Sequence, residues 1–281
     1  MLFNLHTHTH FCDGSDHPEE YVRQALDKGL SILGFSGHAP VPFDNNFAIP
    51  SKTKLLEYVR TVEKLKQKYA GQITIMLALE IDFIPGLTES FDSFREMAGL
   101  DYTIGSVHLV KNLENNRLWF IDGAKTDAYD HGLQDVFEND AKKAVTAYYR
   151  QINTMIINER PRIVGHLDKI KMHNKGRHFT ENDLWYRDLV LSTIDVIKQN
   201  NCIVEVNTRG KYKGRSDSFF PDGWVLGSLI NDDIPLTIST DAHTPEEMTL
   251  GYSEASRYLK EKGCKKIYIP HGDSIKSLPL T

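Results

Sequence analysis

The sequence predicts an α/β protein that folds as a distorted (β/α)7 barrel, similar to a TIM barrel, in a single domain over residues 1–281. Short β-branched apolar runs alternate with longer segments of helical period, and this order repeats seven or eight times. Such alternation is typical of parallel strands joined by helical crossovers. A length of 281 residues matches one barrel, and no Pro/Gly/Ser-rich linker or charge block divides the chain. We therefore expect one closed barrel rather than two open sheets.

The individual elements follow from the same patterns. Eight apolar runs predict strands at residues 2–5, 31–35, 73–79, 102–106, 162–164, 202–206, 235–239 and 266–269. Helical spacing predicts helices at residues 17–28, 52–68, 135–158, 181–199 and 245–262, with weaker signals at 89–98 and 223–230. Ser51, Thr180 and Thr244 stand where N-cap residues favour a helix start. Residues 40–50 and 110–134 lack a regular period, and we expect these two long loops to lie at the barrel mouth.

Composition limits the class of protein and its partners. Apolar residues make up 40% of the chain and charged residues 25%, which is ordinary for a soluble globular protein. No apolar run approaches the ~20 residues of a membrane span, and the N-terminus lacks signal-peptide features, so we expect a cytoplasmic protein without a membrane partner. Cys12, Cys202 and Cys264 have no short pair spacing, which argues against a disulfide framework. A net charge of -5 disfavours nucleic acid as a partner and favours small-molecule chemistry.

Side chains of the types that bind metal ions follow nearly every candidate strand. They are His6, His8, His38, Glu80, His108, His166, Asn207, Asp241 and His243. The carboxyl ends of barrel strands open on one face, so residues far apart in the sequence are expected to meet there. Imidazole and carboxylate ligands suit zinc, manganese or iron better than calcium or magnesium. The sequence therefore predicts a metal centre at this rim, without choosing among the three metals.

Six sequence blocks carry a resemblance to a known family. They are His6-Thr7-His8-Thr9 with Asp13-Gly14, Gly37-His38, Glu80-Ile81-Asp82, Gly105-Ser106-Val107-His108, Gly165-His166-Leu167-Asp168 and Ser239-Thr240-Asp241-Ala242-His243. In order and spacing, these blocks resemble the motifs of the PHP (polymerase and histidinol phosphatase) superfamily. The match is closest to its stand-alone histidinol-phosphate phosphatases, and it runs from about residue 3 to residue 260.

This resemblance implies a distorted seven-stranded barrel with a centre of three metal ions. Carried over residue by residue, it assigns His6, His8, Glu80 and Asp241 to one ion, Glu80, His108 and His166 to a second, and Asp13, His38 and His243 to a third. It also implies hydrolysis of a phosphate monoester. The expected substrate is L-histidinol phosphate, in histidine biosynthesis.

The residue types indicate how such a reaction would proceed. A bridging Glu80 would hold two ions close enough to share a water and lower its pKa, and the resulting hydroxide is the expected nucleophile. Several dications can neutralise the phosphoryl oxygens and the leaving alkoxide, so neither a protein nucleophile nor a Gly-rich phosphate loop is needed. Asp241, His243 or a metal-bound water could protonate the leaving alcohol. Glu80, Asp241 and His243 are therefore the candidate catalytic residues.

Substrate contacts are expected from residues near the strand ends. Arg209 and Lys169 lie just past candidate strands and could hold phosphate oxygens, although loop cations are more often solvated. His271 ends the last candidate strand and is a reserve candidate for a substrate contact. The expected partner is a small phosphate ester, and the sequence does not indicate an oligomeric state.

Other functions on the same scaffold are a phosphoesterase or exonuclease acting on nucleotides or DNA, an amidohydrolase, and a non-catalytic metal-binding module. An amidohydrolase typically bridges its metals with a carboxylated lysine, whereas Glu80 occupies the corresponding strand end. The acidic balance and the absence of a basic track disfavour an exonuclease. All nine expected ligand types are present, so nothing in the sequence indicates a decayed site.

Overall fold

A nearly closed barrel of parallel strands forms the centre of the protein. The computed structural model describes residues 1–123 and 125–280, and within them seven parallel strands pair in one sheet. In sheet order they are β1 (Phe3–Asn4), β2 (Ile32–Phe35), β3 (Thr74–Asp82), β4 (Tyr102–Ser106), β7 (Ile163–Val164), β8 (Ile203–Asn207) and β9 (Leu236–Ser239). The edges meet where Ala242, just after β9, donates its backbone N–H to the His6 carbonyl at 3.1 Å. The predicted (β/α)7 architecture is confirmed.

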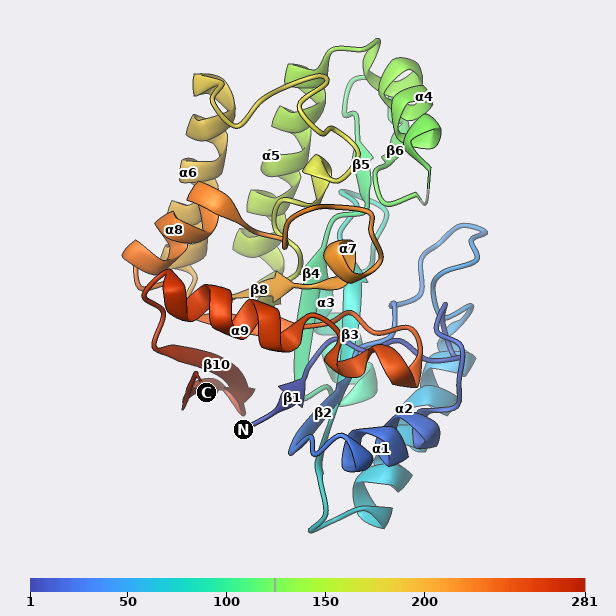
Figure 1. Cartoon of the computed structure of the whole chain (residues 1–281). Coiled ribbons are helices and arrows are strands. Elements are labelled where there is room, and N and C mark those ends of the chain that lie inside the picture. Colours follow the sequence, from blue (N-terminus) through green and yellow to red (C-terminus); the bar gives the residue numbers. More distant parts are fainter. Residues whose placement is uncertain (124, 281) are drawn as a thin grey trace.

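Helices surround these strands (Figure 1). They are α1 (Pro18–Asp27), α2 (Lys52–Lys68), α3 (Phe91–Ala98), α4 (Thr126–Phe137), α5 (Ala141–Glu159), α6 (Leu184–Gln199), α7 (Arg209–Tyr212), α8 (Gly223–Asn231) and α9 (Tyr252–Glu261), with 3-10 turns η1 (Lys169–Lys171) and η2 (Pro245–Thr249). In α2, Leu55, Tyr58, Val62 and Leu65 share the buried face, as an amphipathic helix requires. The Ser51 hydroxyl caps α2 by accepting from the Lys54 N–H at 3.2 Å. No helix among residues 1–123 and 125–280 combines the length and the hydropathy of a membrane span.

The stretch 110–134 was expected to be irregular, and this prediction is wrong. It contains most of an antiparallel hairpin of β5 (Leu109–Lys111) and β6 (Leu118–Phe120), followed by the start of α4. The helix expected at residues 135–158 is also divided. Glu138 takes a left-handed conformation with φ of 55°, and the Asp140 carboxylate then caps α5 by accepting from the Lys143 N–H at 2.8 Å.

The last candidate strand lies outside the barrel. Residues 266–269 fall within β10 (Lys266–His271), which pairs in antiparallel fashion with β11 (Ser274–Pro279). An eighth barrel position is unavailable because the chain after β9 already bonds to the chain after β1. The helix expected at residues 245–262 is likewise interrupted. Gly251, with φ of 73°, separates η2 from α9.

Candidate metal centre

The structure brings the nine predicted ligands together at the carboxyl ends of the barrel strands. We call these residues the ligand cluster: His6, His8, Asp13, His38, Glu80, His108, His166, Asp241 and His243. His6 and His8 both point into the rim because alternate residues of an extended segment share a face. Thr7, between them, instead forms a parallel β-bridge with Ala242. Asp241 has a left-handed backbone with φ of 52°, which a short polar residue tolerates better than most.

Glu80 lies at the middle of the ligand cluster, with its side chain 1% exposed. Its Oε2 atom lies 3.0 Å from His6 Nε2, 3.3 Å from His38 Nδ1 and 3.4 Å from His8 Nε2. Its Oε1 atom lies 3.0 Å from His166 Nε2 and 3.6 Å from His108 Nε2, and it accepts a 2.6 Å hydrogen bond from the Ser106 hydroxyl. One carboxylate therefore faces imidazoles on both of its oxygens, as a bridging ligand must.

The other two carboxylates of the ligand cluster lie on the side of His8 and His243. Asp241 Oδ1 is 3.3 Å from His8 Nε2 and 3.5 Å from His243 Nδ1. Asp13 Oδ2 is 3.2 Å from His243 Nε2, and Asp13 Oδ1 is 3.4 Å from His8 Nδ1. His8 thus belongs to two groups of potential ligands, whereas the family resemblance assigned it to one ion.

The donor atoms of the ligand cluster suit divalent metal ions. His6 Nε2, His8 Nε2 and His38 Nδ1 are buried and have no hydrogen-bond partner, although each lies within 3.4 Å of Glu80 Oε2. Buried polar atoms are rarely left unpaired, and convergent imidazole nitrogens beside a carboxylate are the usual ligands of zinc and similar ions. Coordination of a cation would satisfy all three nitrogens at once.

Glu205, which the sequence analysis did not single out, supports the ligand cluster from behind. It lies in β8 and is fully buried. Its Oε1 atom is 2.6 Å from His6 Nδ1, and its Oε2 atom accepts a 2.8 Å hydrogen bond from the His166 backbone N–H. A carboxylate on the far nitrogen of a metal-binding imidazole fixes the tautomer and orientation of the ring. The sequence feature that could have identified Glu205 is its place as an acidic residue inside the apolar run of β8.

Burial and the neighbouring carboxylates together set the charge of the imidazoles. Burial lowers the pKa of His6, but the negative charges of Glu205, Glu80 and Asp241 outweigh burial and raise this pKa to about 10. Burial dominates for His38 and lowers its pKa to about 4. Although burial opposes ionisation of Glu80, the surrounding imidazoles hold its pKa well below the usual value. The acids of the ligand cluster are therefore ionised at neutral pH.

A cavity of about 630 Å³ opens over the ligand cluster, which is a size that suits a small metabolite. The predicted substrate contacts Lys169 and Arg209 both line it. Lys169 Nζ is 2.7 Å from Asp122 Oδ2, and Arg209 Nη1 donates to the Asp241 carbonyl at 2.8 Å. His271 does not line this cavity. It lies exposed at the end of β10, because that strand forms a separate hairpin and does not end at the barrel rim.

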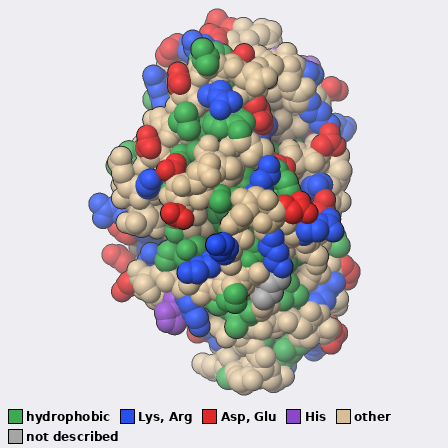
Figure 2. Space-filling view, turned by 60° about the vertical axis from the view of Figure 1, so that its left-hand side comes forward, with side chains coloured by type: hydrophobic (Ala, Val, Ile, Leu, Met, Phe, Trp, Pro, Cys, Tyr) green, Lys and Arg blue, Asp and Glu red, His purple; other side chains and the backbone are tan. Residues whose placement is uncertain are grey.

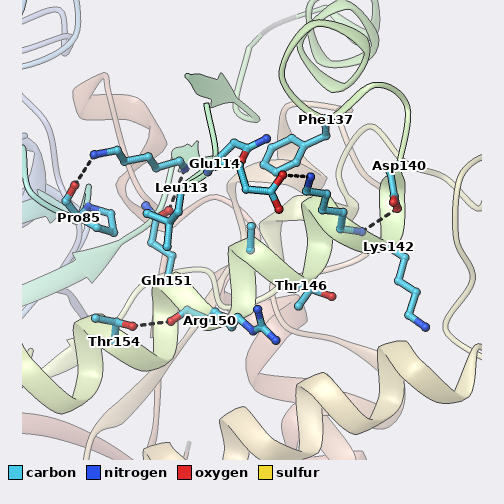
Figure 3. Close-up of a pocket in the computed structure, with 14 residues that line it drawn as sticks. Pro85, Leu113, Glu114, Phe137, Asp140, Lys142, Thr146, Arg150, Gln151 and Thr154 are labelled. Carbon is cyan, nitrogen blue, oxygen red and sulfur yellow. Dashed lines mark hydrogen bonds and ion pairs between the residues drawn. The ribbon is translucent and has the colours of Figure 1, made fainter. Parts of the chain in front are cut away.

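A second cavity, of about 530 Å³, lies between α5 and the β5–β6 hairpin (Figure 3). Its lining includes Leu113, Phe137, Lys142 and Arg150, and it contains no member of the ligand cluster. This cavity is therefore separate from the candidate metal centre.

Comparisons with known proteins agree with the fold. The family model described as PHP domain matches residues 4–209. A protein of Deinococcus radiodurans, named probable histidinol-phosphatase, is 27% identical over 273 residues, which is 96% of this chain and 97% of that protein. The histidinol-phosphatase of Bacillus subtilis is 26% identical and covers 88% of this chain and 95% of its own length. The structure of histidinol phosphate phosphatase from Lactococcus lactis, complexed with zinc, L-histidinol and phosphate, has a TM-score of 0.70 and 20% identity, with 98% of each chain covered.

Proposed function

This chain belongs to the PHP domain family, and from that premise we propose that it is a metal-dependent phosphomonoesterase that hydrolyses L-histidinol phosphate to L-histidinol and phosphate. The observation that carries the proposal is the convergence of six imidazoles and three carboxylates, with Glu80 among them, at one barrel rim. The near full-length similarity to histidinol-phosphatases supports this substrate. The same fold in a protein that binds zinc, L-histidinol and phosphate supports it further.

We assign three metal ions to the ligand cluster, with zinc, manganese and iron as the candidates. Glu80 would bridge two of them, because Oε2 faces His6 and Oε1 faces His166. Such ions, when bound, lower the pKa of a shared water and neutralise charge on the phosphoryl group. Asp13 and His243, 3.2 Å apart, would hold the third ion together with His38.

The protein's own residues would position the phosphate ester. Lys169 Nζ and the Arg209 guanidinium face the cavity and could donate hydrogen bonds to phosphate oxygens. Arg209 also donates to the Asp241 carbonyl, so it holds the backbone of a ligand while it faces substrate. Asp241 and His243 lie at the rim, within reach of the leaving alcohol. Because Asp241 is ionised at neutral pH, it could protonate the alcohol only after accepting a proton from the attacking water.

The arrangement at Glu80 disfavours an amidohydrolase. That class would need a carboxylated lysine where Glu80 stands, and Lys169, which lines the same cavity, is already paired with Asp122. Basic and acidic side chains are interspersed on the face shown in Figure 2. The lining of the metal cavity also combines both signs, with Asp44 and Asp122 beside Lys169 and Arg215, and does not form a basic track for a nucleic-acid backbone.

The assignment of substrate can be tested by measuring phosphate release after reconstitution with manganese or zinc. L-histidinol phosphate, an aryl phosphate and a single-stranded oligonucleotide serve as parallel substrates. We expect a clear preference for L-histidinol phosphate in kcat/KM. Equal rates on all three substrates, or no release from L-histidinol phosphate, would overturn the assignment.

Two substitutions test the proposed roles in the ligand cluster. Glu80→Gln removes the charge that would bridge two ions, and His243→Ala removes a ligand and a possible proton donor. We expect each variant to lose turnover by at least about 1000-fold while circular dichroism stays unchanged. Glu89→Gln is the matched control, because Glu89 is an exposed acid that pairs with Lys52. Activity retained by Glu80→Gln would exclude the bridging role.

A further inference from the structure

Two phenylalanines face each other at the mouth of the metal cavity. Phe47 comes from the loop at residues 40–50, after β2, and Phe120 is the last residue of β6. Both line the cavity. Their ring centroids are 6.5 Å apart, and the ring planes are 10° from parallel. Phe120 is 42% exposed, so packing in the core does not explain an aromatic side chain at this position.

Hydrogen bonds fix the backbone of the loop and of the hairpin that carry the two rings. The Asn45 side-chain carbonyl accepts from the Phe47 N–H at 3.1 Å and from the Ala48 N–H at 2.7 Å, which fixes the loop. Phe120 pairs with Leu109 in the hairpin, and the next residue, Ile121, donates its N–H to the His108 carbonyl at 2.9 Å. The rings are therefore attached to the same framework as the metal ligands.

The parallel orientation of the rings suits a planar guest. Carbon atoms in contact lie about 3.5 Å apart, so a flat ring between two others needs about 7 Å. The centroid separation of 6.5 Å is the upper limit of the spacing between the two ring planes, so a planar guest enters between them as the loop or the hairpin opens. Because the Phe47 ring also packs edge-on against the His38 ring at 5.3 Å, the two rings lie directly beside the ligand cluster. An ester whose phosphate reaches the metals would leave its alcohol portion near these rings.

The surrounding charge suits a cationic guest. Asp44 lies in the same loop as Phe47, is exposed and lines the same cavity. It forms no ion pair with any residue in the described ranges. Asp122 lines the cavity from the hairpin side but is paired with Lys169 at 2.7 Å, so the unpaired negative charge here is that of Asp44. Aromatic faces also attract cations. A protonated amine or imidazolium would therefore meet favourable groups here.

We propose that Phe47 and Phe120 form a clamp that binds the planar ring of the leaving alcohol and thereby selects ring-bearing amino-alcohol phosphates over ringless ones. This inference rests on the proposed phosphatase function and extends it from the phosphate to the specificity for the alcohol. The two residues are specificity determinants, and the hydrolytic step does not depend on them.

The test compares two esters that differ in the ring. L-histidinol phosphate carries an imidazole, whereas 2-aminopropyl phosphate keeps the amine and the phosphate without a ring. We expect the Phe47→Ala/Phe120→Ala variant to lose about 10-fold in kcat/KM on the first ester, mainly through KM, and less than twofold on the second. Phe120→Leu, which keeps apolar bulk without a ring, should behave like Phe120→Ala, whereas Phe120→Tyr should retain the preference. Equal losses on both esters, or no loss on either, would overturn the clamp.

A binding experiment separates this inference from the proposed function. The affinities of L-histidinol and 2-aminopropanol for the metal-loaded protein are measured by calorimetry, without any turnover. We expect the wild type to prefer L-histidinol and the double variant to lose that preference. No preference in the wild type, or the same preference in the double variant, would overturn the clamp even if L-histidinol phosphate is hydrolysed. Failure to hydrolyse that ester would overturn only the proposed function.

Discussion

Glu205 illustrates how one buried residue supports several ligands. An isolated carboxylate inside β8 would be costly, but this one pairs with the His6 ring and accepts from the backbone of His166. Asn207 Nδ2 donates to the same carboxylate at 3.2 Å, and the Ser239 hydroxyl also donates to it. The imidazole of His6 is therefore oriented before any metal binds.

We predict that Glu205→Gln weakens metal binding without unfolding the protein. The amide keeps the size of the side chain but loses the negative charge that increases the basicity of His6. Metal affinity should fall about 10- to 100-fold, as measured by titrating the demetallated protein, and excess metal should restore much of the turnover. The control is Glu254→Gln, an acid that pairs with Lys211 at the surface. Equal affinities for the two variants would contradict the supporting role.

The hairpin of β5 and β6 brings Phe120 to the cavity, and α4 holds the hairpin in place. Trp119 in β6 is 1% exposed, and its indole N–H donates to the Tyr129 carbonyl at 2.9 Å. The indole lies so close to α4 that only a glycine fits opposite it. A Cβ on Gly132 would lie 2.3 Å from Trp119 Cδ1.

We predict that Gly132→Ala destabilises the protein, although alanine favours helices. The added methyl group must displace a buried, hydrogen-bonded indole, so the net loss should be about 1–3 kcal/mol. Gly227→Ala is the matched control, because Gly227 is also helical and a Cβ there meets no atom within 4 Å. Gly227→Ala should raise the free energy of unfolding by up to about 1 kcal/mol. Thermal unfolding midpoints measure both effects. Equal shifts for the two variants would contradict a steric conflict between residue 132 and the Trp119 indole.

At the scale of the whole molecule, the metal centre connects both ends of the barrel sheet. His6 follows β1 and Asp241 follows β9, and His6 Nε2 lies 3.8 Å from Asp241 Oδ1 across the closure of the barrel. Ions held by both edges would stabilise the closed barrel relative to the unfolded chain. Metal binding to the native state alone adds about 2.7 kcal/mol when free metal is 100 times the dissociation constant.

We predict that removing the metal with a chelator lowers the thermal unfolding midpoint, and that the difference in midpoint between the metal-loaded and demetallated forms grows as pH rises above about 6.5. In the demetallated protein the pKa of His6 is about 10, so the bound proton stabilises the fold below the unfolded value of 6.5, and this stabilisation is lost as pH rises toward 10. Burial, with the nearby Glu80 and Asp122 charges, raises the pKa of Asp82 to about 8. The protonated Asp82 therefore also stabilises the fold, and this stabilisation too is lost as pH rises to about 8. The metal-loaded form needs neutral imidazole and gains affinity over this range.

The measurement is a set of thermal unfolding curves at several pH values, with and without chelator, followed by readdition of metal. A gap between the two forms that narrows as pH rises from 6.5 to 9 would contradict the prediction. Glu89→Gln should follow the wild type at every pH, because Glu89 is an exposed acid outside the ligand cluster.

Patterns that depend on neighbours along the chain were readable in advance. The alternation of apolar runs and helical segments is local, and it was enough to predict the barrel and to place His6, Glu80 and His166 at strand ends. The error at residues 110–134 arose because short strands such as β5 and β6 gain their stability from pairing with each other and packing on α4 and α5, not from their own composition.

Contacts between residues that are far apart along the chain were decided only by the tertiary structure. Glu205 reads as a chance acid in an apolar run until β8 is placed behind His6, 199 positions away. Phe47 and Phe120 belong to separate connections and become a pair only at the mouth of the barrel. His271 reads as a strand-end residue, but closure of β1 against β9 excludes β10 from the rim. In each case the position of the side chain is set by contacts with residues distant in the sequence, which the closed barrel brings close. Local periodicity carries no information about those residues.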